Sequence, residues 1–234
     1  MTEQYQVVEN NEYFILIYKK PGTSFHSDDG STGLFETVKK TEKLSELYPV
    51  HRLDKVTSGL LLMAKTAVVN QELVNQFKER KIEKFYLAIS AKKPKKKQGL
   101  IKGDMAAARR GAWKLKQTIV NPAITQFFSS GLGDGKRLFI IKPHTGRTHQ
   151  IRVALKSVGA PILGDSLYAD SATSGELDRV YLHSYSLAFS IQNTFYRFTE
   201  LPREGTYFLD DAFKLSMQEY LAPWEKDWPI LKSG

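Results

Sequence analysis

The chain alternates short apolar runs with polar turns, and the spacing inside each run predicts its secondary structure. Continuous or alternating apolar stretches bounded by Gly, Pro or charged residues are typical of strands. Stretches of this kind predict strands at residues 13–18, 60–64, 83–91, 123–129, 137–142, 182–191 and 196–201. Several of them are joined by short turns, which favours antiparallel neighbours.

Apolar residues spaced about four apart predict helices at residues 34–47, 67–80, 149–158 and 208–221. In the second of these, Val69, Leu73 and Phe77 recur along one helical face. Since strands outnumber helices, the pattern favours an α+β fold in which helices pack on a mixed or antiparallel sheet. No shift in composition marks a boundary, so we expect residues 1–234 to form a single domain.

The charge balance narrows the class of partner. The chain has 34 Lys and Arg against 25 Asp and Glu, a formal net charge of +9, and basic proteins of this kind commonly bind a polyanion. A basic run at residues 92–97 predicts an exposed loop that either is solvated or neutralises phosphates. A basic protein without a polyanionic partner is the alternative interpretation.

Cysteine is absent, which excludes disulfides, thiolate metal sites and a cysteine nucleophile. The N-terminus shows no basic region leading into an apolar stretch, so we expect no signal peptide. The longest apolar runs are too short to cross a bilayer. We therefore expect a soluble cytoplasmic protein, and we take a monomer without membrane partners as the default.

A polar loop at residues 51–59 runs directly into the apolar strand that begins at Leu60, and this loop presents Asp54 between Arg52 and Lys55. One interpretation is that the Asp54 carboxylate caps the turn that follows it. The other is that it acts as a nucleophile or a general base. A neighbouring cation favours the charged form, because it lowers a carboxylate pKa by roughly 1–3 units.

A second polar segment, residues 142–152, lies between a predicted strand and a predicted helix. Thr148 is a candidate N-cap, and the backbone N–H groups of such a terminus bind anions. Arg147 adds a fork of donors that suits phosphate. A solvated basic helix start is the alternative. His144 and His149 lack companion cysteines or carboxylates at ligand spacing, so we expect no metal site.

The predicted strand at residues 84–88 places Lys84 and Tyr86 on one face and Phe85 and Leu87 on the other. The apolar pair predicts the core face. Tyr86 is then either a half-buried side chain with its hydroxyl in water, or a ring that stacks on a base beside Lys84. The pattern alone favours the first interpretation.

Taken together, these segments resemble the RluA-type RNA pseudouridine synthases. The family signature H-R-L-D-x-x-T-S-G-L-L-L-x-A-K is matched at residues 51–65, K-x-Y-x-A at residues 84–88, and H-T-G-R-T-H-Q-I-R at residues 144–152. Weaker matches occur at residues 20–22, 159–168 and 182–187. The matches follow the family order and span about residues 14 to 189.

The resemblance implies an α+β pseudouridine synthase fold on a long, mostly antiparallel sheet, and an isomerase that converts uridine to pseudouridine in transfer RNA, ribosomal RNA or both. It implies base flipping, no metal and no cofactor. Asp54 resembles the catalytic carboxylate, Arg152 its ion-pair partner, and Tyr86 the aromatic that stacks on the uracil. Helix geometry turns Arg152 about 100° from Ile151, away from the core. The implied RNA-binding residues are His51, Arg52, Lys84, Arg147, His149 and Gln150.

The chain departs from the family pattern in three respects. We expect a compact form without the small N-terminal RNA-binding (S4-like) domain, the first motif lacks the small residue between Pro21 and Gly22, and Ala154 stands where relatives often have His. A catalytically silent RNA-binding or ribosome-assembly factor on the same fold is the alternative function. A basic hydrolase with an Asp nucleophile is a third, but no motif supplies its second acid or base.

Overall fold

A single sheet organises the computed structural model, which describes residues 4–26, 32–170, 175 and 177–231. In these residues the sheet has ten strands, in the order β1-β2-β4-β11-β5-β10-β9-β6, with β12 beside β11 and β3 beside β4. The strands are β1 (Tyr5–Asn10), β2 (Phe14–Lys19), β3 (Tyr48–Pro49), β4 (Ser58–Ala64), β5 (Glu83–Ser90), β6 (Gln98–Gly103), β9 (Ala123–Gly133), β10 (Lys136–Pro143), β11 (Leu182–Ile191) and β12 (Thr194–Thr199).

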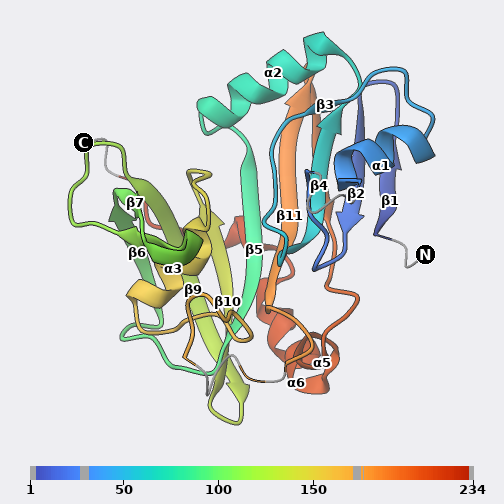
Figure 1. Ribbon diagram of the computed structural model, residues 1–234. Coiled ribbons are helices and arrows are strands. Elements are labelled where there is room, and N and C mark those ends of the chain that lie inside the picture. The colour runs from blue at the N-terminus through green and yellow to red at the C-terminus, as the bar shows by residue number, and fades with distance from the viewer. Residues whose placement is uncertain (1–3, 27–31, 171–174, 176, 232–234) are drawn as a thin grey trace.

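Every neighbouring pair in this sheet is antiparallel except β4 with β11, which is parallel. The sheet is therefore mixed and mostly antiparallel, as the resemblance implies. Figure 1 shows β5 near the middle of the sheet, with β10 and β9 on one side and β11 and β4 on the other. A separate hairpin is formed by β7 (Met105–Ala107) and β8 (Trp113–Leu115).

The helices are short and flank the sheet. They are α1 (Leu34–Thr41), α2 (Ala67–Lys78), α3 (Gln150–Ser157), α5 (Thr206–Leu209) and α6 (Asp211–Met217), with 3₁₀ turns at Arg109–Gly111, Gln218–Tyr220 and Pro223–Glu225. No helix among the described residues combines the length and the apolar character needed to cross a bilayer.

All four predicted helices extend past the observed ones, two of them by one or two residues and the other two by several. The helix predicted at residues 34–47 ends at Thr41, and Lys43 then adopts a left-handed φ of 52°. The helix predicted at residues 208–221 is interrupted at Asp210, whose side chain accepts a hydrogen bond from the Phe213 N–H and caps a new helix. At both places a local turn or cap ends the helix before the apolar spacing does.

The strand β4 is buried on both faces, which explains its continuous apolar sequence. Its odd-numbered residues, Leu61 and Met63, join the larger core that includes α1. Its even-numbered residues, Leu60 and Leu62, join a second core beneath α2. The loop that carries Asp54 thus leads into one of the most firmly packed strands of the molecule.

Glycine is required where β4 meets β11. Gly59 has a φ of +106°, and an added Cβ would lie 2.2 Å from the Ser184 carbonyl oxygen. The parallel ladder pairs Ser58 with His183 and Gly59 with Ser184. This close approach holds the start of β4 against β11. Because β11 also pairs with β5, the loop before β4 lies near β5, and Asp54 and Tyr86 line the same hollow.

Candidate active site

The turn after Asp54 is closed by the main chain. The Thr57 N–H donates to the Asp54 carbonyl over 3.0 Å, and the carboxylate instead lies within 3.4 Å of the Arg152 Nη1 atom. The Asp54 side chain is 18% exposed, so it is held close to protein groups and still reaches solvent. This geometry weighs against the turn-cap interpretation of Asp54.

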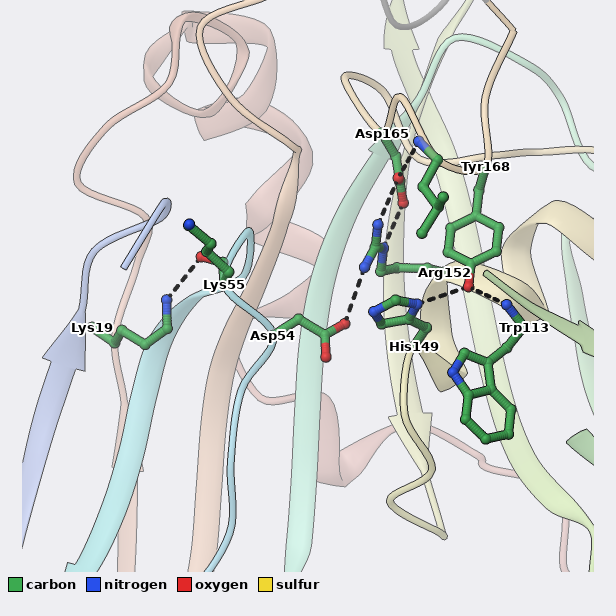
Figure 2. A network of polar contacts seen from close by, with 9 residues as sticks. Lys19, Asp54, Lys55, Trp113, His149, Arg152, Asp165 and Tyr168 are labelled. Atoms are coloured by element: carbon green, nitrogen blue, oxygen red, sulfur yellow. Dashed lines mark hydrogen bonds and ion pairs between the residues drawn. The ribbon is translucent and has the colours of Figure 1, made fainter. Parts of the chain in front are cut away.

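A buried lysine supports this loop from the end of β2. Lys19 is 0% exposed, and its Nζ atom donates to the carbonyls of Lys20 (2.9 Å) and Lys55 (3.1 Å). Burial, together with the positive charge of Arg179 and against the opposing charge of Asp54, lowers the pKa of Lys19 to about 7. Figure 2 shows this ammonium on the side of the loop away from Arg152.

Arg152 extends from α3 and is clamped by a second carboxylate. Its Nε and Nη2 atoms donate to the two oxygens of Asp165 over 2.7 and 2.8 Å, which leaves Nη1 directed at Asp54. Its guanidinium also lies 4.9 Å from the centre of the Tyr168 ring. Burial alone lowers the pKa of Arg152, but the hydrogen bonds and charges of Asp165 and Asp54 outweigh it and raise the pKa.

The start of α3 differs from the sequence prediction. The N-cap is His149 rather than Thr148, and His149 adopts a left-handed conformation with φ 57° and no side-chain capping bond. Its Nδ1 atom lies 2.8 Å from the Tyr168 hydroxyl, which accepts a hydrogen bond from the Trp113 N–H, also over 2.8 Å. A non-glycine residue in this conformation at a polar hollow is typical of a functional site.

The surroundings of the His149 ring favour its neutral form. Burial lowers the pKa of His149, and the neighbouring Arg152 charge lowers it further. Among the described residues, Nδ1 is the acceptor within reach of the Tyr168 hydroxyl proton. The remaining proton of the neutral ring then sits on Nε2, where it forms a donor for a ligand.

Gln150 was expected to position RNA, and the structure gives its amide other partners. Its Oε1 atom accepts from the Thr145 hydroxyl and the Arg147 N–H, and its Nε2 atom donates to the Ile124 carbonyl and the Thr125 hydroxyl. The side chain is buried and its hydrogen-bonding capacity is used within the protein. Gln150 therefore shapes the loop before α3.

His51 is similarly occupied. Its Nε2 atom accepts a hydrogen bond from the Leu62 N–H over 3.0 Å, and its ring stacks on Phe77. Burial, followed by the charge of Lys84, lowers the pKa of His51 to about 3. A neutral His51 thus ties the loop to β4, and only part of its ring faces the hollow.

The β5 strand contributes Lys84 and Tyr86 on one face, as predicted; Tyr86 is buried and not half-buried, and Lys84 beside it is buried as well. The Lys84 ammonium lies 5.2 Å from the centre of the Phe77 ring, and burial lowers its pKa to about 8. Burial raises the pKa of Tyr86 to about 12, in spite of a hydrogen bond with Ser184. The Tyr86 hydroxyl therefore stays protonated at neutral pH.

All nine residues singled out from the sequence line one hollow of about 230 Å³. They are Asp54, Tyr86 and Arg152, with His51, Arg52, Lys84, Arg147, His149 and Gln150. Sequence reasoning gave no role to Asp165 or Tyr168, although both stand in the matched segment at residues 159–168. Within the described part of the chain, no three His, Asp or Glu side chains gather in a way that would hold a metal ion.

Comparison with known proteins gives consistent matches. A family model described as RNA pseudouridylate synthase matches residues 13–157. An uncharacterized RNA pseudouridine synthase of Haemophilus influenzae is 50% identical and covers 92% of this chain and 96% of its own length. The ribosomal large subunit pseudouridine synthase C of Rickettsia bellii is 37% identical over 60% of this chain, which spans about half (48%) of that protein.

A solved structure supports the fold. Human RNA Pseudouridylate Synthase Domain Containing 1 aligns with a TM-score of 0.70 at 22% identity, covering 84% of this chain and 82% of that one. At this identity the likeness concerns the fold alone.

Proposed function

The chain belongs to the RNA pseudouridylate synthase family, whose members are isomerases that act on RNA, and from that premise we propose that Asp54 is its catalytic carboxylate. The observation that carries the proposal is the ion pair between Asp54 and the clamped Arg152, beside Tyr86 in a single hollow. The guanidinium remains charged at any working pH and so places a fixed positive charge beside the Asp54 carboxylate.

In the proposed reaction the N1–C1′ bond of a uridine breaks, the uracil turns while it is held, and C5 bonds to C1′. The proton on C5 leaves and N1 gains one, so the atoms balance without an oxidant, a metal or a cofactor. Tyr86 supplies a ring that stacks on the uracil and a protonated hydroxyl near the reacting edge. The target base must leave its stack, which costs a few kcal/mol and less in a loop.

The remaining side chains of the hollow are proposed to hold RNA. Arg52 and Arg147 are exposed cations at its rim, and the Arg147 guanidinium already bonds to the Asn121 side chain. His149 offers its Nε2 proton and Lys84 its ammonium. His51 and Gln150 act indirectly, by fixing the loops that present Asp54 and Arg147.

The substrate is proposed to be ribosomal RNA, transfer RNA or both. A ribosomal RNA substrate is supported by the name of the large-subunit relative, and transfer RNA by the resemblance to the compact members of the family. Residues 1–234 are proposed to act as one catalytic domain and as a monomer. Mapping pseudouridine across cellular RNA with and without this protein identifies the uridine that it modifies.

The test of the proposed function is Asp54→Asn, which removes the charge and keeps the shape. Pseudouridine formation is expected to fall to background while RNA affinity stays within about twofold, since Asn still fits beside Arg152. Asp134→Asn is the matched control, because Asp134 is an exposed carboxylate in the β9–β10 turn. Continued pseudouridine formation by Asp54→Asn overturns the assignment. RNA binding without any product from the wild-type protein would instead support the silent RNA-binding factor.

A further inference from the structure

A second hollow, of about 350 Å³, continues from the first around the end of the sheet where α2 leads into β5 and β10 ends. The two hollows share Lys84 and Pro143. The second is lined by Arg80, Lys81, Ile82, Glu83, Lys84, Lys142, Pro143, His144, Ala188 and Phe195. None of the family motifs accounts for most of this set.

Lys84 is the side chain at the junction. It is 9% exposed, and within the described residues its ammonium makes no hydrogen bond or ion pair and only lies above the Phe77 ring. The side chain is mostly buried, but its ammonium is open to the two hollows, because Nζ is not among the fully buried polar atoms that lack a partner. An anion that bridges the two hollows would supply the missing acceptor.

The charge of the second hollow suits an anion as well. Four cationic side chains line it against the single carboxylate of Glu83, and one of the four, Lys81, pairs with Glu79 outside the lining over 2.6 Å, so the charges of Arg80 and Lys84 are the ones left without a carboxylate among the described residues. The Glu83 carboxylate is already neutralised, because it accepts from Lys142 over 2.8 Å and from Arg197 over 3.0 Å. The guanidinium of Arg80 is exposed and makes no hydrogen bond or ion pair with the described residues. The lining therefore has uncompensated positive charge.

An exposed aromatic ring completes the pattern. Phe195, on β12, is 61% exposed and lies 5.2 Å from the Arg197 guanidinium. A large apolar ring in water is unfavourable by itself, whereas bases of single-stranded RNA stack on such rings between phosphate-binding cations. This combination distinguishes an RNA strand from a free phosphate ion, which has no use for the ring.

We propose that the second hollow binds the single-stranded RNA that flanks the target nucleotide, with Arg80 and Lys84 on its phosphates and Phe195 under a base. The proposal rests on the proposed function to the extent that the first hollow holds the target uridine. The strand then leaves the first hollow past Lys84 and turns around the end of the sheet. RNA length thereby becomes a determinant of affinity.

The test compares a labelled single-stranded RNA of about 20 nucleotides with one of about 6, both with a central uridine, because such grooves typically cover about 4–16 nucleotides. Arg80→Gln is expected to weaken binding of the longer RNA about fivefold and to leave the shorter within about twofold. The slope of log affinity against log salt should fall by about 0.7 for each lost phosphate contact. Phe195→Ser should weaken the longer RNA about tenfold.

Matched controls are Lys214→Gln and Leu215→Ser, which make the same kinds of change at exposed positions of α6. Both should bind the two RNAs as the wild type does. The proposal is overturned if Arg80→Gln and Phe195→Ser bind the longer RNA normally, or if they weaken the two RNAs equally. The assay measures RNA binding, so its outcome is independent of catalysis. If the wild-type protein forms no pseudouridine, the proposed function is overturned. If it forms pseudouridine but the variants show no dependence on RNA length, only the proposed RNA binding by the second hollow is overturned.

Discussion

Two buried arginines flank the Asp54 loop, and their partners give them opposite properties. Arg152 and Arg179 are 6% and 8% exposed. Arg152 is bound by the carboxylates of Asp165 and Asp54, and its pKa is raised in spite of burial. Arg179 donates to neutral oxygens only among the described residues, and burial lowers its pKa. Because the two side chains are similarly buried, the difference comes from their partners: Arg152 binds carboxylates, whereas Arg179 binds mainly backbone carbonyls.

The Arg179 network is closed. Arg179 Nη2 donates to the Ser58 hydroxyl over 2.6 Å, so that hydroxyl gives its own proton to His183 Nδ1 at 2.7 Å. His183 Nε2 then donates to the Glu200 carbonyl. Each of these hydrogen-bonding atoms has a protein partner, and Arg179, Ser58 and His183 do not line the hollow around Asp54. The Arg152 network, in contrast, ends at the partly exposed Asp54. The first network holds the start of β4, and the second leaves one bond available for chemistry.

Among variants that test the two arginine networks, Asp165→Asn is expected to have the largest effect. The amide keeps the volume but cannot accept both guanidinium bonds, so Arg152 turns away from Asp54. We expect the rate at saturating RNA to fall about 100-fold, a loss typical of misplacing a reacting group by about 1 Å. The concentration of RNA at half-maximal rate should stay nearly unchanged, because Asp165 does not line the hollow. Steady-state kinetics, corrected for the folded fraction, measure both quantities.

The matched control for that experiment is Asp178→Asn. Asp178 also serves a local hydrogen-bond cluster, with Tyr181 and Thr206, but lies outside the hollow. It should leave the saturated rate within about twofold. An equal loss in both variants would mean that Asp165 acts through general stability, and the contrast between the two arginine networks would break.

Arg179→Met tests the closed network and should affect stability instead of rate. Methionine fills part of the volume but leaves several buried oxygens without a donor, at about 3 kcal/mol of unfolding free energy. In a chain of this size that lowers the melting temperature by roughly 6–12 °C. The rate per folded molecule should stay within about threefold of wild type. A normal melting temperature with a strongly reduced rate would place Arg179 in the catalytic machinery.

The smallest expected effect is a pH dependence of stability from His183. Burial lowers its folded-state pKa from 6.5 to about 3, so the neutral form is required for the closed network. This contribution is complete above about pH 6.5 and is lost as the pH falls toward 3, because the unfolded chain binds the proton first. At pH 5 the loss is about 2 kcal/mol.

Chemical denaturation at pH 7 and pH 5 measures this change. His183→Gln keeps a donor toward the Glu200 carbonyl, lowers stability at pH 7, and should reduce the difference between the two pH values. His51 and His144, whose pKa values are also lowered by burial, contribute in the same direction in both proteins. An unchanged pH difference in His183→Gln would remove His183 from the closed network.

The sequence predicted the candidate site residues that lie in regular elements or directly before them. Asp54 precedes a strand, Tyr86 lies within one, and Arg152 lies in the first turn of a helix, so period and motif together located them. Seven of the ten strands of the main sheet were predicted, because most of those seven are buried on both faces and therefore keep apolar runs, whereas β1, β3 and β6 are partly exposed or very short and were not predicted. The order of the strands in the sheet was not predicted, because the parallel β4–β11 pairing joins segments that are far apart in the sequence and includes a close approach at Gly59.

The sequence did not predict the partners that act across space. Asp165 and Tyr168 lie in an irregular segment without periodicity, and only the folded chain shows that they clamp Arg152 and hold His149. Gln150 was expected to bind RNA from the family resemblance, because the sequence does not show that β9 brings its acceptors Ile124 and Thr125 beside it. The N-cap at Thr148 was wrong because His149 adopts a left-handed conformation that no spacing rule indicates.

The position of β11 sets the order in which the site can be assembled. Residues 182–191 form the strand between β4 and β5, so Asp54 and Tyr86 have no shared support until that late segment has been synthesised and has paired with both. The contacts that bring them together span long stretches of sequence, which makes this a slow, late step. A nascent chain released before β11 is complete thus carries every proposed catalytic side chain and still lacks an active site.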